Sequence, residues 1–301
     1  MTNYQKAWIE SFRIKTLSLG FSSILIGSIL AQFKNNFHWK IFFLLLITIF
    51  LLQILSNLAN DYGDNIKGCD AFKRIGNLRG MQKGLINKSK MKKALKLNIF
   101  IICISGLILI FVSCKNLKDI IIFSIIGIAS IISAITYTIG KKPYGYIGLG
   151  DIFVLFFFGW ISVISTYYLQ SNTFDTITLL PSTACGFLSV AVLNINNMRD
   201  IKNDIKSKKK TLVVRIGIKY AKIYHAIIII IAILCFICFN LLYINNIKSW
   251  LFLLGIPMLI NNILYVFKSS TAKSMNLLLE HMINSSLIIN ILFCIGIIFS
   301  K

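Results

Sequence analysis

The sequence predicts an all-α protein, a polytopic membrane helix bundle of about nine transmembrane helices with its N-terminus in the cytoplasm. Of the 301 residues, 56% are hydrophobic and only 14% are charged, whereas roughly a quarter of the residues of a soluble globular domain are charged. Long apolar runs recur along the chain, and lysine and arginine gather between them. These observations indicate that lipid surrounds most of the protein.

The apolar runs define the expected helices in order, because a transmembrane helix needs about 20 mostly apolar residues. The connecting segments are short, so we expect one intramembrane domain over residues 1–301, with related halves at about 1–145 and 146–301. The charged N-terminal segment lacks a small-residue cleavage site, which argues against a cleaved signal peptide. The nine charge-free runs cover residues 16–33, 41–60, 97–114, 120–140, 152–174, 176–198, 226–247, 249–267 and 282–300.

The formal net charge of +22 follows this topology. If the N-terminus is cytoplasmic and the runs alternate across the membrane, 26 of the 32 lysine and arginine residues lie on the cytoplasmic side. This is the positive-inside pattern, which favours a multi-pass protein of the cytoplasmic (inner) membrane and argues against a nucleic-acid partner. No protein partner can be inferred. The basic residues on the far side are Lys34, Lys40, Lys115, Lys118, Lys248 and Lys301.

Two basic segments hold half of the acidic residues. The first, residues 60–93, follows the second apolar run, and the other, residues 199–222, follows the sixth. Both runs end in asparagines at similar spacing from the acidic residues, so the segments form a weak internal repeat. We expect two cytoplasmic loops that together form one site facing the cytoplasm. Their acidic residues are Asp61, Asp64, Asp70, Asp200 and Asp204.

Amides at the end of the second run predict a polar surface inside the membrane. Gln53, Asn57 and Asn60 are spaced so that they share one helical face, and Asp61 and Asp64 continue that face. Polar side chains in a membrane helix are costly unless they face a polar interior. We therefore expect this face to line a wet cavity.

The carboxylate pairs predict a site for Mg²⁺ and a diphosphate. Asp61 and Asp64 are three residues apart, and Asp200 and Asp204 are four apart, so each pair repels on one helical face. A cation removes this repulsion, and Mg²⁺ is typically held by one or two carboxylates, waters and substrate phosphates. Nearby Lys and Arg would neutralise the remaining phosphate charge. The alternative, solvated loop charges, accounts for one pair but poorly for two matched pairs.

Residues 55–64, LSNLANDYGD, resemble the first Asp-rich motif of the UbiA superfamily of intramembrane prenyltransferases, and residues 197–204, NMRDIKND, are similar to the second. Segments 74–80, 148–151 and 210–217 resemble the MenA branch, the 1,4-dihydroxy-2-naphthoate polyprenyltransferases. The resemblance covers nearly the whole chain. The sequence departs from the superfamily pattern where a third Asp is frequent, because Gly68 stands there and Asp70 follows two residues later.

The resemblance implies roles for individual residues. Four would bind the Mg²⁺ cofactor and act as catalytic residues, namely Asp61, Asp64, Asp200 and Asp204. Four would contact the diphosphate, namely Arg13, Arg79, Lys141 and Asn60. Further candidates at the site are Asn57, Asn197, Tyr137, Asp70 and Asp151.

The resemblance also implies a nine-helix bundle with a lateral opening to lipid, and a reaction. A polyprenyl group would pass from polyprenyl diphosphate to 1,4-dihydroxy-2-naphthoate in a Mg²⁺-dependent step, with loss of the ring carboxylate, giving demethylmenaquinone. This reaction is chemically reasonable, because diphosphate is a good leaving group once its charge is neutralised by Mg²⁺ and basic residues. An apolar bundle would keep water away from the allylic cation.

Alternatives remain open. A sister enzyme of the superfamily would use another aromatic acceptor such as 4-hydroxybenzoate, although the flanking segments favour the naphthoate. A membrane transporter fits the sequence less well, because transporters bind their substrates near the membrane midplane and the acidic residues here cluster at the ends of apolar runs.

Three histidines, His38, His225 and His281, form no ligand cluster in the sequence, and we expect them at the membrane interface.

Overall fold

The computed structural model describes residues 1–68, 80–244 and 246–301. In this part of the chain, nine helical segments are long and apolar enough to span a membrane. The predicted all-α bundle with nine spanning helices is therefore confirmed. The spans are Asn3–Phe33, Trp39–Ile66, Lys88–Ser113, Leu117–Thr136, Gly150–Ser171, Thr176–Lys206, Leu212–Tyr243, Ile247–Lys268 and Ala272–Ser300.

Several spans contain more than one helical element. The α-helices are α1 (Asn3–Phe12), α2 (Leu17–Phe33), α3 (Trp39–Ile66), α4 (Lys88–Ser113), α5 (Leu117–Thr136), α6 (Gly150–Val154), α7 (Ser162–Ser171), α8 (Leu179–Lys206), α9 (Leu212–Tyr243), α10 (Ile256–Lys268) and α11 (Ala272–Ser300). A π-helical segment, Leu155–Ile161, joins α6 to α7. Short 3-10 segments are η1 (Ile14–Thr16), η3 (Tyr144–Tyr146), η5 (Thr176–Thr178) and η6 (Ile247–Gly255).

The helices extend beyond the charge-free runs that predicted them. α3 continues to Ile66 and α8 to Lys206, so both aspartate pairs lie on helices and not on the loops that we expected. A charged residue ends an apolar run but not the helix, because a charged side chain at a helix end can extend into a polar site or into water while the backbone stays helical. His225 lies inside α9 and is fully buried, and its predicted position at the membrane interface stays a prediction.

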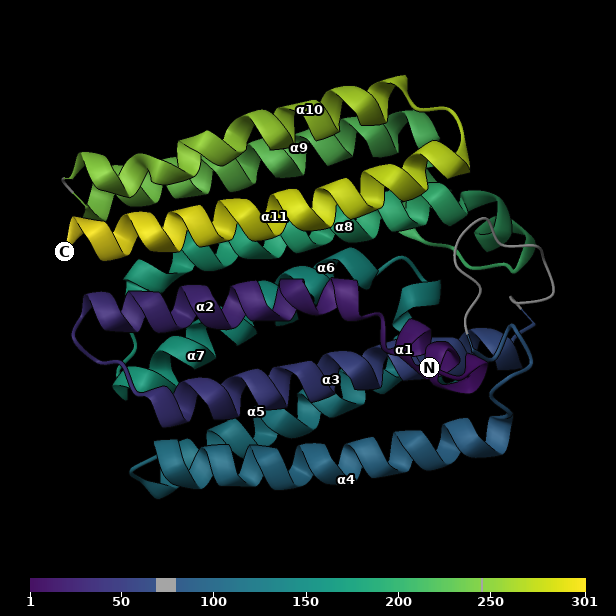
Figure 1. Ribbon diagram of the computed structural model, residues 1–301, viewed down its shortest axis with the longest axis horizontal. Helices are drawn as coiled ribbons and strands as arrows, with labels where there is room; N and C mark the ends of the chain where they lie inside the picture. The colour runs from purple at the N-terminus through teal and green to yellow at the C-terminus, as the bar shows by residue number, and fades with distance from the viewer. Residues whose placement is uncertain (69–79, 245) are drawn as a thin grey trace.

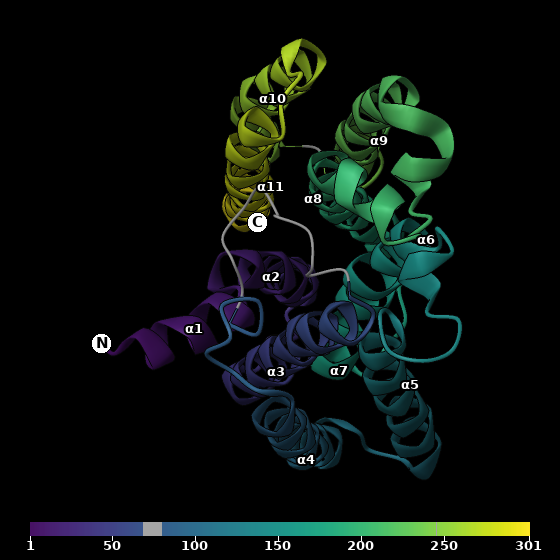
Figure 2. The same ribbon diagram turned by 90° about the vertical axis from the view of Figure 1, so that its right-hand side faces the viewer.

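The helices lie side by side along the longest axis of the molecule (Figure 1). Viewed from one end, α8 to α11 form one side of the bundle and α3 to α5 the other, with α2 between them (Figure 2). α2 packs against α3 on one side and against α8 and α11 on the other. The side formed by α8 to α11 has one buried apolar cluster and the side formed by α3 to α5 has two. α2 contributes Ile26 and Leu30 to the first and Ile24 to one of the other two.

Two glycines allow α8 to approach the π-helical segment closely. A Cβ atom added to Gly159 would lie 2.7 Å from the Ser182 carbonyl oxygen and 2.9 Å from the Gly186 Cα. A larger side chain at this position would separate the two elements. Such π-helical turns are frequent beside functional sites, and this one borders the cavity described below.

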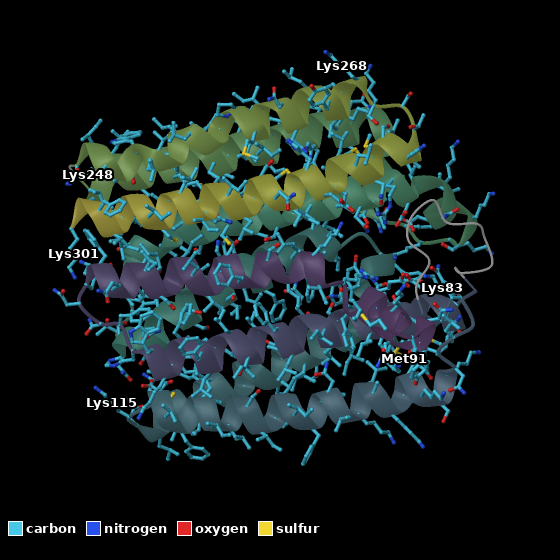
Figure 3. All side chains as sticks on the ribbon, in the orientation of Figure 1. Lys83, Met91, Lys115, Lys248, Lys268 and Lys301 are labelled. Atoms are coloured by element: carbon cyan, nitrogen blue, oxygen red, sulfur yellow. The ribbon has the colours of Figure 1, made fainter. Side chains whose placement is uncertain are left out.

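Basic side chains occupy the two ends of the bundle as the topology predicts. Lys83 and Lys268 lie at the end where α3 and α8 finish, which we call the aspartate end (Figure 3). Lys115, Lys248 and Lys301 lie at the opposite end, which we call the far end. The alternation of spans therefore agrees with the sequence. The cytoplasmic location of the aspartate end stays a prediction.

Candidate active site

The last turns of α3 carry two buried carboxylates at the aspartate end. Asp61 and Asp64 are 1% and 5% exposed. Arg13 Nη2 lies 3.4 Å from Asp61 Oδ1. Asp64 Oδ1 accepts a hydrogen bond of 2.9 Å from the Tyr146 hydroxyl, and Lys209 Nζ lies 3.7 Å from the same oxygen. Each carboxylate has a cation beside it, which offsets part of the cost of removing its charge from water.

A break between α1 and α2 positions Arg13. Its backbone is left-handed, with φ 53° and ψ 55°, so the chain changes direction there. Asn57 Nδ2 donates to the Phe12 carbonyl at 2.9 Å, and Gln53 Nε2 donates to the Thr16 carbonyl at 2.6 Å. The amide face of α3 lines a cavity, as predicted, and it also holds the N-terminal segment in place.

Asn60 connects Arg13 to Asp64. With its amide oriented to satisfy both neighbours, Nδ2 donates to Asp64 Oδ2 at 2.9 Å and the oxygen accepts from Arg13 Nη2 at 3.2 Å. The same Arg13 nitrogen also contacts Asp61. The sequence predicted that these four residues share a site, and the structure brings them together.

The second carboxylate pair lies on the last turns of α8. Asp200 forms a bidentate pair with Arg199, whose Nε and Nη2 donate to the two carboxylate oxygens at 2.9 and 2.8 Å. The guanidinium also donates to Asn196 Oδ1 at 2.7 Å and to Asn276 Oδ1 of α11 at 3.0 Å. Asp204 is buried one turn further on. The sequence did not single out Arg199, because residues next to each other on a helix do not ordinarily face each other.

Two loops supply Tyr146 and Lys209, which the sequence also did not single out. The Lys210 backbone N–H donates to the Tyr146 carbonyl at 3.1 Å, and Arg215 Nη2 donates to the Ile147 carbonyl at 2.7 Å, so the loops before α6 and before α9 are joined. Lys209 Nζ lies 5.1 Å from the centroid of the Tyr146 ring. A run of three lysines was visible in the sequence, but only the fold turns the middle one inward.

Of the remaining candidate site residues, some lie at the cavity and others lie away from it. Tyr137 lines the cavity, and Asn197 is buried on α8. Lys141 is exposed on the loop after α5 and, among the described residues, forms no ion pair with a carboxylate. Asp151 is buried in α6 and lies outside the cavity lining.

Two candidates, Asp70 and Arg79, lie outside the described residues. Their roles stay predictions. Tyr144, which the sequence did not single out, lines the cavity beside Tyr137, and their ring centroids are 5.3 Å apart. Burial raises the pKa of the Tyr144 phenol, so this group stays neutral and keeps its hydrogen bond to the Ser133 carbonyl at 2.9 Å.

A cavity of about 690 Å³ extends from the aspartate end into the bundle. Arg13, Asn60, Tyr137 and Arg199 line its polar end, and the aspartates lie just behind these residues. Apolar side chains of α3, α5, α7 and the π-helical segment line most of its length. The arrangement can bind a ligand with an anionic head and a long apolar tail.

The carboxylates fit Mg²⁺ as two pairs and not as one cluster. Within residues 1–68, 80–244 and 246–301, no three His, Cys, Asp or Glu side chains converge closely enough to hold a metal ion. Mg²⁺ typically needs only one or two carboxylates when a substrate phosphate completes its ligands. Asp61 with Asp64, and Asp200 with Asp204, would each hold an ion in this way.

The sequence and the fold both point to one class of membrane enzymes, the prenyltransferases. The model of the UbiA prenyltransferase family matches residues 21–286 of the chain. A solved structure, described as digeranylgeranylglyceryl phosphate synthase in membranes, has the same fold, with a TM-score of 0.59 and 18% identity, covering 99% of this chain and 100% of that one. The chain belongs to the UbiA prenyltransferase family.

Curated relatives define the branch of the family. A 1,4-dihydroxy-2-naphthoate octaprenyltransferase of Escherichia coli (strain K12) is 50% identical over 296 residues, which cover 98% of this chain and 96% of the relative. A protein of the same name from Haemophilus influenzae is 44% identical over 295 residues, covering 97% and 96%. The resemblance to the naphthoate branch is therefore confirmed over nearly the full length of the chain.

Proposed function

We propose that this protein transfers a polyprenyl group from polyprenyl diphosphate to 1,4-dihydroxy-2-naphthoate, with loss of the ring carboxylate, and so makes demethylmenaquinone. The observation that carries the proposal is the cavity, whose cationic head and apolar length fit the two parts of the donor. The acceptor rests on the two relatives, which share almost the whole chain. From the basic-residue distribution we place the site at the cytoplasmic face of the inner membrane.

The residues at the polar end would hold the diphosphate and stabilise its departure. Arg13, Arg199 and Lys209 are cations held by buried carboxylates, so their positions are set before the substrate binds. Preorganised charges of this kind stabilise developing negative charge at little cost in reorganisation. The family is generally dependent on a divalent metal, and bound Mg²⁺ would neutralise further charge on the leaving diphosphate. Lys141, on an exposed loop, stays a proposed contact.

The apolar part of the cavity would protect the reacting centre. Phe153, Phe157 and Phe158 line it close to Tyr137, and Phe153 stacks on Tyr144 with centroids 3.9 Å apart. Excluding water from this region would prevent capture of an allylic cation before the naphthoate ring attacks. Aromatic faces also attract cations, so these rings favour the charge that develops.

An acceptor competition tests the proposal. Membranes containing the protein are given a polyprenyl diphosphate and Mg²⁺ with equal amounts of 1,4-dihydroxy-2-naphthoate and 4-hydroxybenzoate, and the products are identified by mass. We expect prenylated, decarboxylated naphthoate product. Product from hydroxybenzoate alone would contradict the proposed acceptor, and unchanged transfer after metal chelation would contradict the Mg²⁺ requirement.

A further inference from the structure

The cavity ends in a floor of apolar side chains close to the far end. Leu45 of α3, Phe123 of α5 and Leu169 of α7 all line it and are all buried. They belong to one packed apolar cluster together with Ile110 of α4. Because these residues come from four different helices, the floor closes the space between the helices and is not a single protruding side chain.

The floor is fixed in position by polar contacts behind it. The Phe123 ring packs on Tyr168, with centroids 5.4 Å apart. The Tyr168 hydroxyl donates to Asp119 Oδ1 at 2.8 Å, and Asn116 Nδ2 donates to Asp119 Oδ2 at 2.8 Å. These bonds tie α7 to the start of α5. A ligand tail that reaches Phe123 therefore meets a supported surface.

The helices give the depth of the cavity. Tyr137 lines the polar end and Phe123 lies four turns away along α5, which corresponds to roughly 21 Å at 1.5 Å per residue. One extended isoprene unit adds four bonds of about 1.5 Å each, or ~5 Å in length. The straight path from the polar end to the floor therefore holds about four isoprene units.

Gly127 lies on this path, one helical turn before Phe123. It lines the cavity, and a Cβ atom added there would find no other atom within 4 Å. A side chain at this position would project into open space without a backbone clash. Gly127 is about 15 Å from Tyr137 along the helix, which corresponds to about three isoprene units.

We propose that Gly127 and the floor at Phe123 determine which lengths of prenyl tail the enzyme binds straight. The open position at Gly127 admits the fourth isoprene unit, and Phe123 stops the chain after it. Tails longer than this must bend or leave the cavity sideways into lipid. The inference rests on the proposed function, because it assumes that the donor tail occupies this cavity.

The test compares a short and a longer donor, geranyl and geranylgeranyl diphosphate, on Gly127→Phe. The geranyl tail ends before Gly127, so its kcat/KM should stay within about two-fold of wild type. The geranylgeranyl tail must pass the new ring, so its kcat/KM should fall by about ten-fold or more, because the last unit loses its apolar contacts. Equal effects on the two donors, or no effect on either, would overturn the proposal.

Two further variants separate a tail effect from a general one. Ile125→Phe adds the same ring on the outer side of α5, where residue 125 is 61% exposed and does not line the cavity. This variant should treat the two donors as wild type does. Phe123→Ala removes the stop, so kcat/KM for a donor one isoprene unit longer than geranylgeranyl should rise relative to kcat/KM for geranylgeranyl diphosphate, compared with the same ratio in wild type. No shift in a folded Phe123→Ala protein would remove the floor from the proposal.

Donor binding is measured separately from transfer. Thermal unfolding of the detergent-solubilised protein is followed with the thiolodiphosphate analogues of both donors and no acceptor. If the enzyme uses a different acceptor, transfer to the naphthoate fails in wild type, but the analogues should still stabilise it. Gly127→Phe should then lose stabilisation by the longer analogue only. Stabilisation of Gly127→Phe by both analogues as in wild type would contradict the inference, whatever the acceptor is.

Discussion

Arg199 and Asp200 are consecutive residues whose side chains pair, although neighbours on a helix ordinarily point apart. The guanidinium bonds to both carboxylate oxygens and, with its other donors, to Asn196 and to Asn276 of α11. A planar fork with five donors can satisfy all of these partners, whereas a lysine ammonium cannot. This one residue therefore orients a carboxylate and also joins α8 to α11 at the polar end of the cavity.

Arg199→Lys keeps the charge and removes the fork. We expect kcat/KM for the donor to fall by about ten-fold, since hydrogen bonds to charged groups contribute about 1.5–3 kcal/mol each. Steady-state kinetics in membranes measures the change. Lys202→Arg, at an exposed position of the same helix, is the control and should match wild type. Wild-type kinetics in Arg199→Lys would show that the additional hydrogen bonds of the guanidinium group are unimportant for catalysis.

Asp61→Asn and Asp200→Asn test the carboxylates with almost no change in shape. Each removes one charge that we assign to Mg²⁺, so prenyl transfer should fall by about a hundred-fold or more, while the protein stays in the membrane. Activity is measured against Mg²⁺ concentration, with protein amount determined by immunoblot. Asp175→Asn, at the far end and paired there with Lys34, should be active. Substantial activity in either site variant would refute the metal assignment.

The aspartates could be predicted from the sequence because few acidic residues occur and these lie at matched positions after apolar runs. The side chains that contact these aspartates could not all be predicted. Arg13 followed from family resemblance, but Tyr146 and Lys209 reach Asp64 from loops that are distant in sequence. Among 32 basic residues, composition gives no way to distinguish Lys209 as one that turns toward a buried carboxylate.

At the scale of elements, α9, α10 and α11 are joined by a chain of polar side chains that is largely buried. His225 Nε2 lies 3.0 Å from Asn262 Oδ1, and Asn262 Nδ2 lies 3.1 Å from His281 Nδ1. Asn262 Nδ2 also donates to the Leu278 carbonyl at 3.2 Å. One asparagine of α10, itself fully buried, thus contacts both neighbouring helices.

Asn262→Leu should destabilise this side of the bundle. The expected loss is about 1 kcal/mol, which is typical of interhelical hydrogen bonds in membranes, with little change in kcat for the folded fraction. Equilibrium unfolding in bicelles measures it. Asn261→Leu is a matched control, because Asn261 is exposed on the same helix. Equal stability of the two variants would show that the chain contributes nothing.

The number of helices could be predicted because each span requires its own long apolar run. Their ends could not, since α3, α8, α9 and α11 continue past the charges that end those runs. The π-helical turn at residues 155–161 could not be predicted from the sequence either. Its sequence is apolar on every side, so periodicity cannot distinguish it from an α-helix.

At the scale of the whole molecule, α2 joins two groups of helices, and the cavity lies between them. Both groups contribute to its polar end, Asn60 from α3 and Arg199 from α8. A site built from both sides explains why the acidic segments occur twice in the sequence. The division into halves near residue 145 stays a prediction.

The orientation of the whole molecule is tested by labelling introduced cysteines in intact cells with a membrane-impermeant thiol reagent. Lys248→Cys, at the far end, should be labelled from outside, and Lys83→Cys should be labelled only after the cells are opened. For each variant, the labelling of intact cells is compared with that of opened cells, after subtraction of the labelling of the native cysteines. The reverse pattern would place the aspartate end outside and contradict the positive-inside assignment.

The most direct test of the central claim is identification by mass of the quinones in cells that lack the gene. We predict that menaquinone and demethylmenaquinone disappear, that 1,4-dihydroxy-2-naphthoate accumulates, and that wild type but not Asp61→Asn restores the quinones. Retention of menaquinone together with loss of a different prenylated quinone would contradict the account.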